Sequence, residues 1–532
     1  MSAATSLKRT SIAPVLSAGL LVLVLQPALA QGIPADEVTS SSLKFARVYQ
    51  TLEENYAAPI DPDHVILDGG IRAMLASLDP FSSFFDKSQF AMLQQETRGE
   101  ALGFGSILYV QPGKITIIQT QQGSPSWRAG LGPGDEVVAV NGVSTEPLGL
   151  RQLIALLQAA KSHPVHLTVI RPGDLKPTDV TMKPAEVNLP TVDTSFVGAN
   201  GIGYIHIASF ESKTPQEVMA ALRHIGAEHL KGIILDLRNN PGGVLEAAVE
   251  VCSIFLKPGA VVLTVEGRAV PQKTYGTVPV PSHVDVPLIT LVNGSTASAA
   301  EVVAAALQDH DRALVVGEPT FGKGVVENVV PLSNDMGLAL LTAEYFTPSG
   351  RSVQKPLPGT ALQNPALGIR ATGLDPRSAD TPVFHTDDGR PVRAAGGVSP
   401  DVSAPDWKMD PWLTFLNQTG MFTSFASAYV SIHHPIAKTF EPDTATLETF
   451  RNFLTSQRIR SPERYWSQDQ EYLQGRIRTE IFNLEFGLDY GNQVAAEEDP
   501  QVRKAASLFP EISKLLKSSP EERRSYATSR KQ

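Results

Sequence analysis

Three hydroxyl side chains stand just ahead of an alanine-rich segment and are the first candidates for chemistry. Ser295, Thr296 and Ser298 belong to the stretch NGSTASAAEVVAAALQ, residues 293–308. Serine and threonine are preferred at helix N-caps, and Ser298 with Glu301 has the spacing of a capping box. A serine hydroxyl can instead act as a nucleophile when a base removes its proton. The stretch alone leaves both roles open.

Histidine is the usual base for such a serine, and the next one along the chain is His310. It follows Ser298 by twelve residues within one predicted helix, which separates the two by about 18 Å. Their side chains therefore cannot meet, and no G-x-S-x-G motif surrounds any serine. These observations argue against a Ser-His-Asp hydrolase.

Lysine is the second candidate base, and Lys323 stands between two glycines in GEPTFGKGVVENVVPL. It follows Ser298 by 25 residues, enough for a helix, a strand and a turn that return the chain to the helix start. A neutral lysine serves as a general base when burial lowers its pKa. The flanking glycines let the backbone and a substrate approach closely. A surface lysine in a turn is the alternative interpretation.

Glu327 stands four residues beyond Lys323. On a predicted strand over residues 325–330, the two side chains share a face, so we expect the carboxylate to reach the lysine amine. An ionised carboxylate favours the protonated amine, the wrong direction for a base at neutral pH. A protonated Glu327 in a dry pocket would only orient the amine.

The surrounding elements predict an α/β fold with additions at both ends. Strands alternate with helices over about 198–350, which implies an α/β layer. Residues 40–97 show helical periodicity, and about 99–185 form short strands separated by glycine and proline. From 408 onward the chain is mostly helical and charged, typical of either a solvated appendage or a dimerisation surface.

Composition excludes several classes of function. The 532-residue chain has a net charge of −10 and no arginine-rich run outside its last residues, so nucleic acid is not an expected partner. Cys252 is the only cysteine, so neither an intramolecular disulfide nor a Cys/His metal cluster can form. We expect Cys252 to be a buried, inert thiol, and we expect no metal or other cofactor.

The first residues have the pattern of a signal peptide. Lys8 and Arg9 precede an apolar run over residues 12–25, followed by Ala-Leu-Ala at 28–30. A basic region, a short apolar region and an A-x-A site predict cleavage before Gln31 and export to the periplasm, either free or associated with the membrane. A hydrophobic helix of the fold is the alternative.

A glycine turn opens the β-rich module. Gly103, Phe104, Gly105 and Ser106 precede a strand that includes Ile107. Successive amides in such a turn bind anions, and the strand edge can accept an extended peptide. The following text, SPSWRAGLGPGDEVVAVNG, resembles a PDZ domain. The resemblance implies capture of a free C-terminus, with its carboxylate on the GFGS amides and an apolar side chain in an adjacent pocket. A β-module without a ligand is the alternative.

Several separate motifs resemble the carboxyl-terminal processing peptidases, or tail-specific proteases. They are LDLRNNPGG, NGSTASAAEVVAAALQD, GEPTFGKGVV and FTPSGRSVQ, in the family's order within residues 40–405. The resemblance implies a serine peptidase with an inserted PDZ domain, Ser298 as nucleophile and Lys323 as general base. It also implies an oxyanion hole from the amides of Ala299 and Gly242.

Two positions depart from the family pattern. Many members carry glutamine where this chain has Glu327, and some relatives carry a PDZ arginine where this chain has Ala159 or Ala160. That arginine is thought to report ligand occupancy to the active site.

The sequence thus predicts an exported endopeptidase that recognises apolar C-termini through its PDZ domain and cleaves with a Ser-Lys dyad. A homodimer through the helical terminal regions is one of the two interpretations of those regions, and a catalytically silent PDZ adaptor is the alternative function. The predicted parts are a signal peptide 1–30, a helical segment 31–98, a PDZ domain 99–185, an α/β protease core with a mixed sheet 186–405, and a helical C-terminal region 406–532.

Overall fold

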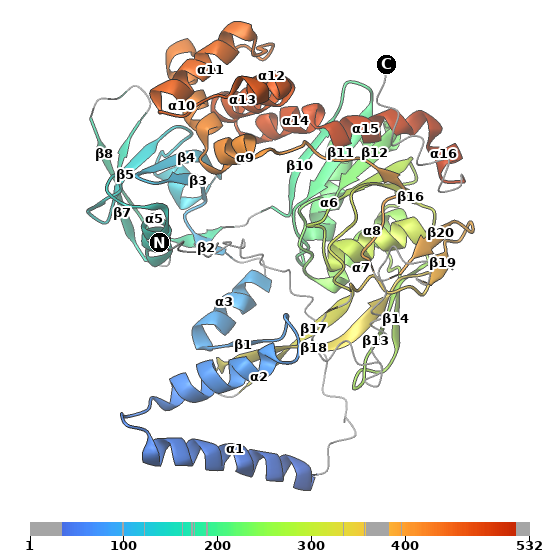
Figure 1. The fold of residues 1–532 in the computed structure, drawn as a ribbon. Helices are drawn as coiled ribbons and strands as arrows, with labels where there is room; N and C mark the ends of the chain where they lie inside the picture. Colours follow the sequence, from blue (N-terminus) through green and yellow to red (C-terminus); the bar gives the residue numbers. More distant parts are fainter. Residues whose placement is uncertain are drawn as a thin grey trace, which may run out of the picture.

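A computed structural model gives the fold of most of the chain. It describes residues 35–97, 101–121, 123–161, 163–171, 174, 176–187, 190–332, 335–355, 357, 382–394 and 396–517. The predicted signal peptide lies outside the described residues. Four parts are seen in Figure 1: an N-terminal helical arm, a β-rich module, an α/β core and a helical C-terminal region. The predicted fold class is confirmed. No helix in the described ranges is long and apolar enough to cross a membrane.

The N-terminal arm is mostly helical, and one short strand near its end pairs with the core. Its elements are α1 (Ala35–Asn55), η1 (His64–Ile71), α2 (Arg72–Ala76), β1 (Ser83–Phe85) and α3 (Lys87–Thr97). Strand β1 pairs antiparallel with β18 of the core and so joins the arm to it. Helix α1 projects away from the body (Figure 1) and exposes a set of apolar side chains: Val38, Leu43, Phe45, Val48 and Leu52.

The β-rich module is a six-strand antiparallel sheet with one long helix. The strands run in the order β3-β4-β5-β7-β8, with β6 paired to β5. Its elements are β3 (Ser106–Gln111), β4 (Lys114–Thr120), α4 (Pro125–Arg128), β5 (Glu136–Val140), β6 (Val143–Ser144), α5 (Leu150–Ala160), β7 (Val165–Ile170) and β8 (Thr178–Met182). The short pair β2 (Ala101–Gly103) and β9 (Ala185–Val187) brings the two ends of the module together.

The main sheet of the core has the order β10-β11-β12-β15-β16-β21, and all pairs are parallel except β10 with β11. Its middle strands are continuous apolar runs, as expected for parallel strands covered on both faces. The elements are β10 (Val192–Val197), β11 (Ile202–Ile207), α6 (Thr214–His224), η2 (Ala227–His229), β12 (Gly232–Asp236), α7 (Leu245–Phe255), β15 (Leu288–Val292), α8 (Ala299–Asp309), β16 (Ala313–Gly317) and β21 (Val402–Ser403). Every residue of α8 is buried, which explains its alanine-rich sequence, and Cys252 on α7 is buried as expected.

A second sheet completes the core. Its strands are β1, β18 (Gly337–Phe346), β13 (Val261–Glu266) and β14 (Lys273–Gly276), with β17 (Val325–Pro331) also paired to β18. The alternation of strands and helices over about 198–350 predicts a single α/β layer, but β13, within that range, pairs antiparallel with β18 of this second sheet. Alternation alone does not say which sheet an apolar strand joins. A hairpin of β19 (Val383–His385) and β20 (Pro391–Arg393) lies beside the core.

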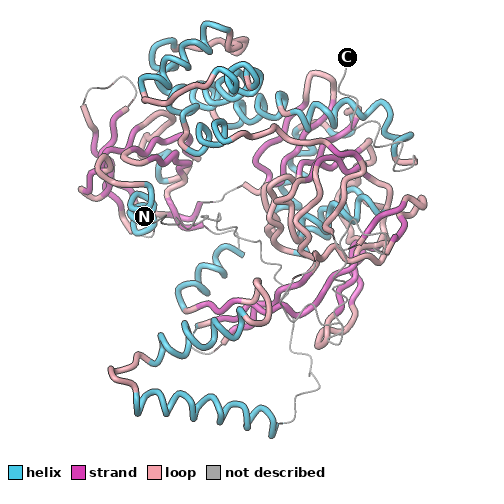
Figure 2. Tube along the Cα trace, viewed as in Figure 1, coloured by secondary structure: helices cyan, strands magenta, loops and turns pink. Residues whose placement is uncertain are grey.

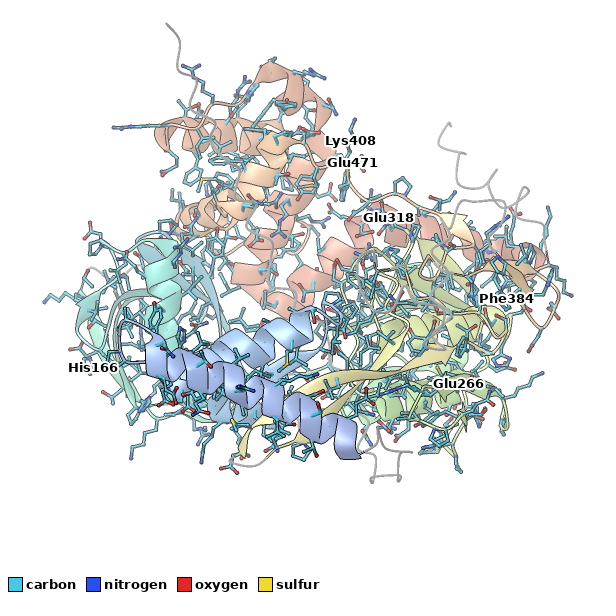
Figure 3. The ribbon with its side chains drawn as sticks, turned by 60° about the horizontal axis from the view of Figure 1, so that its bottom comes forward. His166, Glu266, Glu318, Phe384, Lys408 and Glu471 are labelled. Carbon is cyan, nitrogen blue, oxygen red and sulfur yellow. The ribbon has the colours of Figure 1, made fainter. Side chains whose placement is uncertain are left out.

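The C-terminal region is a folded helical unit that spans two other parts. It comprises α9 (Pro411–Gln418), α10 (Met421–His433), α11 (Thr444–Ser456), α12 (Glu463–Gln468), α13 (Gln470–Phe486), α14 (Leu488–Glu498), α15 (Pro500–Leu508), η6 (Phe509–Glu511) and α16 (Ile512–Leu515). Helices α9 to α13 enclose their own aromatic core and lie over the β-rich module (Figures 1 and 2). Helices α15 and α16 pack on the outer face of the main sheet. Figure 3 shows the same arrangement, with His166 on the β-rich module, Glu471 on the C-terminal region and Glu266 on the core.

Candidate active site

Ser298 occupies the N-cap of α8, directly after the turn that follows β15. Its backbone angles are φ +55° and ψ −119°, a conformation that residues other than glycine rarely adopt. The side chain is fully buried, and Oγ has no hydrogen-bond partner within the described chain. A strained backbone and an unbonded hydroxyl are more than a helix cap requires. They favour the nucleophile.

One buried carboxylate joins the segment of Ser298 to that of Lys323. Oε2 of Glu301 accepts hydrogen bonds from the amide of Ser298 at 3.0 Å and from the amide of Lys323 at 2.8 Å. Oε1 accepts from the amide of Gly322 at 2.7 Å. Burial raises the pKa of Glu301, and the surrounding donors, including the Thr320 hydroxyl, oppose that rise. The predicted reach of Glu301 back to Ser298 is confirmed, and the carboxylate also holds the lysine turn.

Tyr345 of β18 completes this link from the opposite side. Its hydroxyl lies 3.0 Å from the carbonyl oxygen of Lys323 and 3.3 Å from that of Ser298. Burial raises the pKa of Tyr345 well above its ordinary value, so the phenol remains protonated and can donate. Nothing in the sequence indicated that Tyr345 contacts this site, because Tyr345 follows Ser298 by 47 residues and no local pattern connects the two.

The Lys323 amine is bonded to Glu327 in this arrangement. Nζ lies 2.8 Å from Oε2 of Glu327, with both side chains almost fully buried, and 4.8 Å from the centre of the Phe81 ring. Burial raises the pKa of Glu327, and the charge of Lys323 opposes the rise. No hydrogen bond joins Nζ to the Ser298 hydroxyl. The structure therefore brings the predicted pair to one site, with the amine held by Glu327.

The predicted oxyanion loop lies directly against Ser298. At Gly242 (φ +96°) a Cβ atom would lie 2.8 Å from Ser298 Cβ and 2.8 Å from the amide nitrogen of Ala299, so only glycine fits there. The amide of Gly242 donates to Oδ1 of Asn240 at 2.8 Å. Its role as an oxyanion donor stays a prediction and requires that bond to open.

Other catalytic arrangements lack support in the described residues. His310 is engaged by Asp387 and by the carbonyl oxygen of Val261, at 2.7 Å each. No group of three or more His, Cys, Asp or Glu side chains that could hold a metal ion is found among the residues with described positions.

The five residues predicted to bind a C-terminus line a cavity of about 920 Å³ in the β-rich module. The cavity runs between β3 and α5, and Leu108, Leu157 and Leu167 contribute to its apolar lining. Gly105 has φ +71° and no room for a side chain, since a Cβ atom would meet Ser124 at 2.3 Å. The sequence did not show that Leu488, Asp489 and Asn492 of the C-terminal region also line this cavity.

Parts of this chain resemble two family models and several known proteases. The model of peptidase family S41 matches residues 201–361, and the PDZ domain model matches residues 116–171. A carboxyl-terminal-processing protease of Synechocystis sp. is 36% identical over 308 residues, which cover 56% of this chain and 71% of that protein. A carboxy-terminal-processing protease of Bartonella bacilliformis is 33% identical over 347 residues, covering 64% and 78%. Among solved structures, a photosystem II D1 C-terminal processing protease is 29% identical, covers 58% of this chain and 84% of its own, and has a TM-score of 0.35.

Replacing Glu327 tests the lysine as a base. Loss of the carboxylate charge makes the amine easier to deprotonate, so Glu327→Gln should move the acidic limb of the kcat/KM profile to lower pH by about one unit. The measurement is proteolysis of an unstructured substrate from pH 6 to pH 10. A limb that stays in place or moves upward would contradict control of the base by Glu327.

Ser298→Ala and Lys323→Ala should each abolish proteolysis, and the double variant should be no worse than either single one, because the two residues act as a unit. Cleavage of labelled casein measures this, with Ser295→Ala as the matched control. Near-normal turnover of Ser298→Ala, with loss in Ser295→Ala, would show that the nucleophile is Ser295.

Proposed function

Because the chain belongs to the carboxyl-terminal processing peptidases of family S41 and is a serine-type peptidase, we propose that it is an exported endopeptidase specific for apolar protein C-termini. The observation that carries the catalytic part is the unbonded Ser298 hydroxyl on a strained N-cap, tied to Lys323 through Glu301. The comparisons favour an enzyme over the silent adaptor, and the adaptor is set aside.

Ser298 is the nucleophile in the proposed reaction. Lys323 leaves Glu327, takes the Oγ proton as neutral amine, and Oγ attacks the scissile carbonyl. The protonated lysine gives its proton to the leaving amine as the C–N bond breaks and an acyl-enzyme forms. Water, deprotonated by Lys323, then releases the acyl group and restores the serine.

Developing negative charge is stabilised at the start of α8. The amide of Ala299 belongs to its first turn, where unpaired N–H groups and the helix dipole favour an oxyanion. The Gly242 turn supplies the second donor once its amide leaves Asn240.

The module cavity binds the substrate's chain end in this proposal. Gly103, Phe104, Gly105 and Ser106 form the turn that would receive the carboxylate, with Ile107 at the edge of β3. The apolar lining between β3 and α5 suits an aliphatic or aromatic terminal side chain.

Export and dimerisation are further parts of the proposal. The basic, apolar and Ala-Leu-Ala pattern before Gln31 supports cleavage of a signal peptide on export. N-terminal sequencing of the exported protein tests this, and a chain that still began at Met1 would contradict the cleavage. The exposed apolar side chains of α1 support pairing with α1 of a second copy.

Peptide binding tests recognition of the chain end. Full-length Ser298→Ala should bind a peptide with an apolar free-acid terminus at least about tenfold more tightly than its C-terminal amide or an Asp-Asp-ended version, because the turn amides need an anion. Fluorescence anisotropy measures both affinities. Equal affinity for acid and amide would remove the proposed recognition.

Charged substitutions on α1 test the dimer. Leu43 and Val48 are 65% and 61% exposed, so Leu43→Asp with Val48→Asp should leave the fold intact and shift the protein from dimer to monomer in analytical ultracentrifugation. Ser42→Asp on the same helix is the control. An unchanged mass would show that α1 does not pair.

A further inference from the structure

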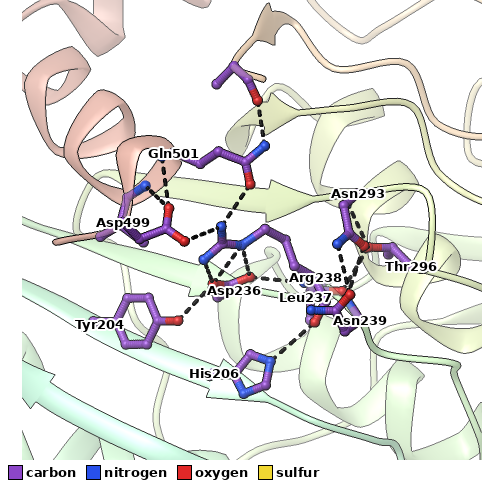
Figure 4. Close-up of polar contacts among 12 residues, drawn as sticks. Tyr204, His206, Asp236, Leu237, Arg238, Asn239, Asn293, Thr296, Asp499 and Gln501 are labelled. Carbon is purple, nitrogen blue, oxygen red and sulfur yellow. Dashed lines mark hydrogen bonds and ion pairs between the residues drawn. The ribbon is translucent and has the colours of Figure 1, made fainter. Parts of the chain in front are cut away.

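Arg238 connects the active-site loop to the C-terminal region. Its Nη1 donates to Oδ2 of Asp499 at 2.8 Å and to Oε1 of Gln501 at 2.7 Å (Figure 4). Nε and Nη2 donate to Asp236, the last residue of β12. Arg238 is only 9% exposed. Among the described residues, the C-terminal region therefore supplies both acceptors for Nη1, and Asp236 of the core supplies those for Nε and Nη2.

The two partners of Arg238 are themselves held firmly. Oδ1 of Asp499 caps α15 by accepting from the amides of Gln501 and Val502, while Oδ2 binds Arg238. Gln501 is fully buried, and its Nε2 donates to the carbonyl oxygen of Ala404. The following helices are fixed to the main sheet by apolar side chains: Val502, Ala505, Leu508, Phe509 and Ile512.

The backbone of Arg238 runs directly into the turn beside the nucleophile. The next amide, of Asn239, donates to Oδ1 of Asn293 at 3.0 Å, and the carbonyl oxygen of Asn240 accepts from the amide of Ala297 at 2.9 Å. Gly242 then lies in contact with Ser298. A shift of Arg238 would therefore move this turn against the nucleophile.

His206 restrains Arg238 from the other side. Its Nε2 lies 3.2 Å from the Arg238 carbonyl oxygen and its Nδ1 2.6 Å from Oδ1 of Asp193. Although burial disfavours its charged form, the nearby carboxylates of Asp193 and Asp236 raise the pKa of His206 to about 9. Protonated at neutral pH, the ring can donate to both partners.

We infer that Asp499 and Gln501 are positioning residues for the peptidase reaction, acting through Arg238 on the Asn239–Gly243 turn. A buried guanidinium that loses half its partners must move to find others, because an unpaired buried charge is costly. The inference rests on the proposed roles of Ser298 and this turn. It gives a function to a region that lies beyond the matches to both family models.

The test compares variants that keep the helix cap but release Arg238. Asparagine and serine are both good N-caps, so Asp499→Asn and Asp499→Ser should preserve α15. Arg503→Ala is the matched control. Arg503 lies on the exposed side of α15, and its guanidinium pairs with Glu471 of α13. Each full-length variant is assayed for kcat and KM on casein, for thermal unfolding, and for the rate at which an alkyl fluorophosphonate labels Ser298.

Both Asp499 variants should lose about tenfold in kcat and in labelling rate, with KM little changed, because displacing an oxyanion donor weakens only the transition state. The control should keep wild-type values. Wild-type kcat and labelling in folded Asp499 variants would overturn the inference. If wild-type protein failed to cleave casein, the proposed function would fail, and the labelling rates would still decide the role of Asp499.

Discussion

The buried carboxylate of Glu301 is the constraint on which the candidate site depends. Ser298 and Lys323 belong to different loops, one before α8 and one before β17, and each loop has an amide that needs an acceptor. One carboxylate satisfies both, at 3.0 and 2.8 Å. A fully buried carboxylate without donors would be costly, so the loops and Glu301 stabilise one another. Substitution of Glu301 would leave the loops of Ser298 and Lys323 without their shared acceptor.

The cost of burying a charge also explains why Glu327 lies beside Lys323. A charged amine in a dry site needs a partner, and Glu327 supplies one at 2.8 Å while Phe81 offers its ring face. The pairing that makes a buried lysine tolerable also withholds it from the serine. In this arrangement no hydrogen bond joins the amine to the Ser298 hydroxyl, and the proposed reaction requires the lysine to exchange a carboxylate for that hydroxyl.

Local sequence patterns predicted the parts of the site that are local. The capping spacing indicated Glu301, the strand period indicated that Glu327 reaches Lys323, and the glycine turn placed Gly105 at the cavity. The contacts that join distant segments had no such signal. Tyr345, Asp499 and the second sheet depend on how packed layers meet, which periodicity does not encode. The charged C-terminal helices indicated either a solvated appendage or a dimerisation surface, because periodicity does not show that α9 to α13 enclose a core of their own or that α15 and α16 pack on the main sheet.

The C-terminal region gives the molecule a fixed frame. Leu488, at the start of α14, donates its amide to Gln119 beside the module cavity, and Asp499, just after the end of α14, binds Arg238 of the core. Helix α14 has 11 residues, a span of about 16 Å, and a single helix does not shorten. One rigid element thus links the edge of the cavity to Arg238, which precedes the turn beside Ser298. Within the proposed function, a chain end bound in the cavity would therefore lie in a fixed relation to the turn beside Ser298.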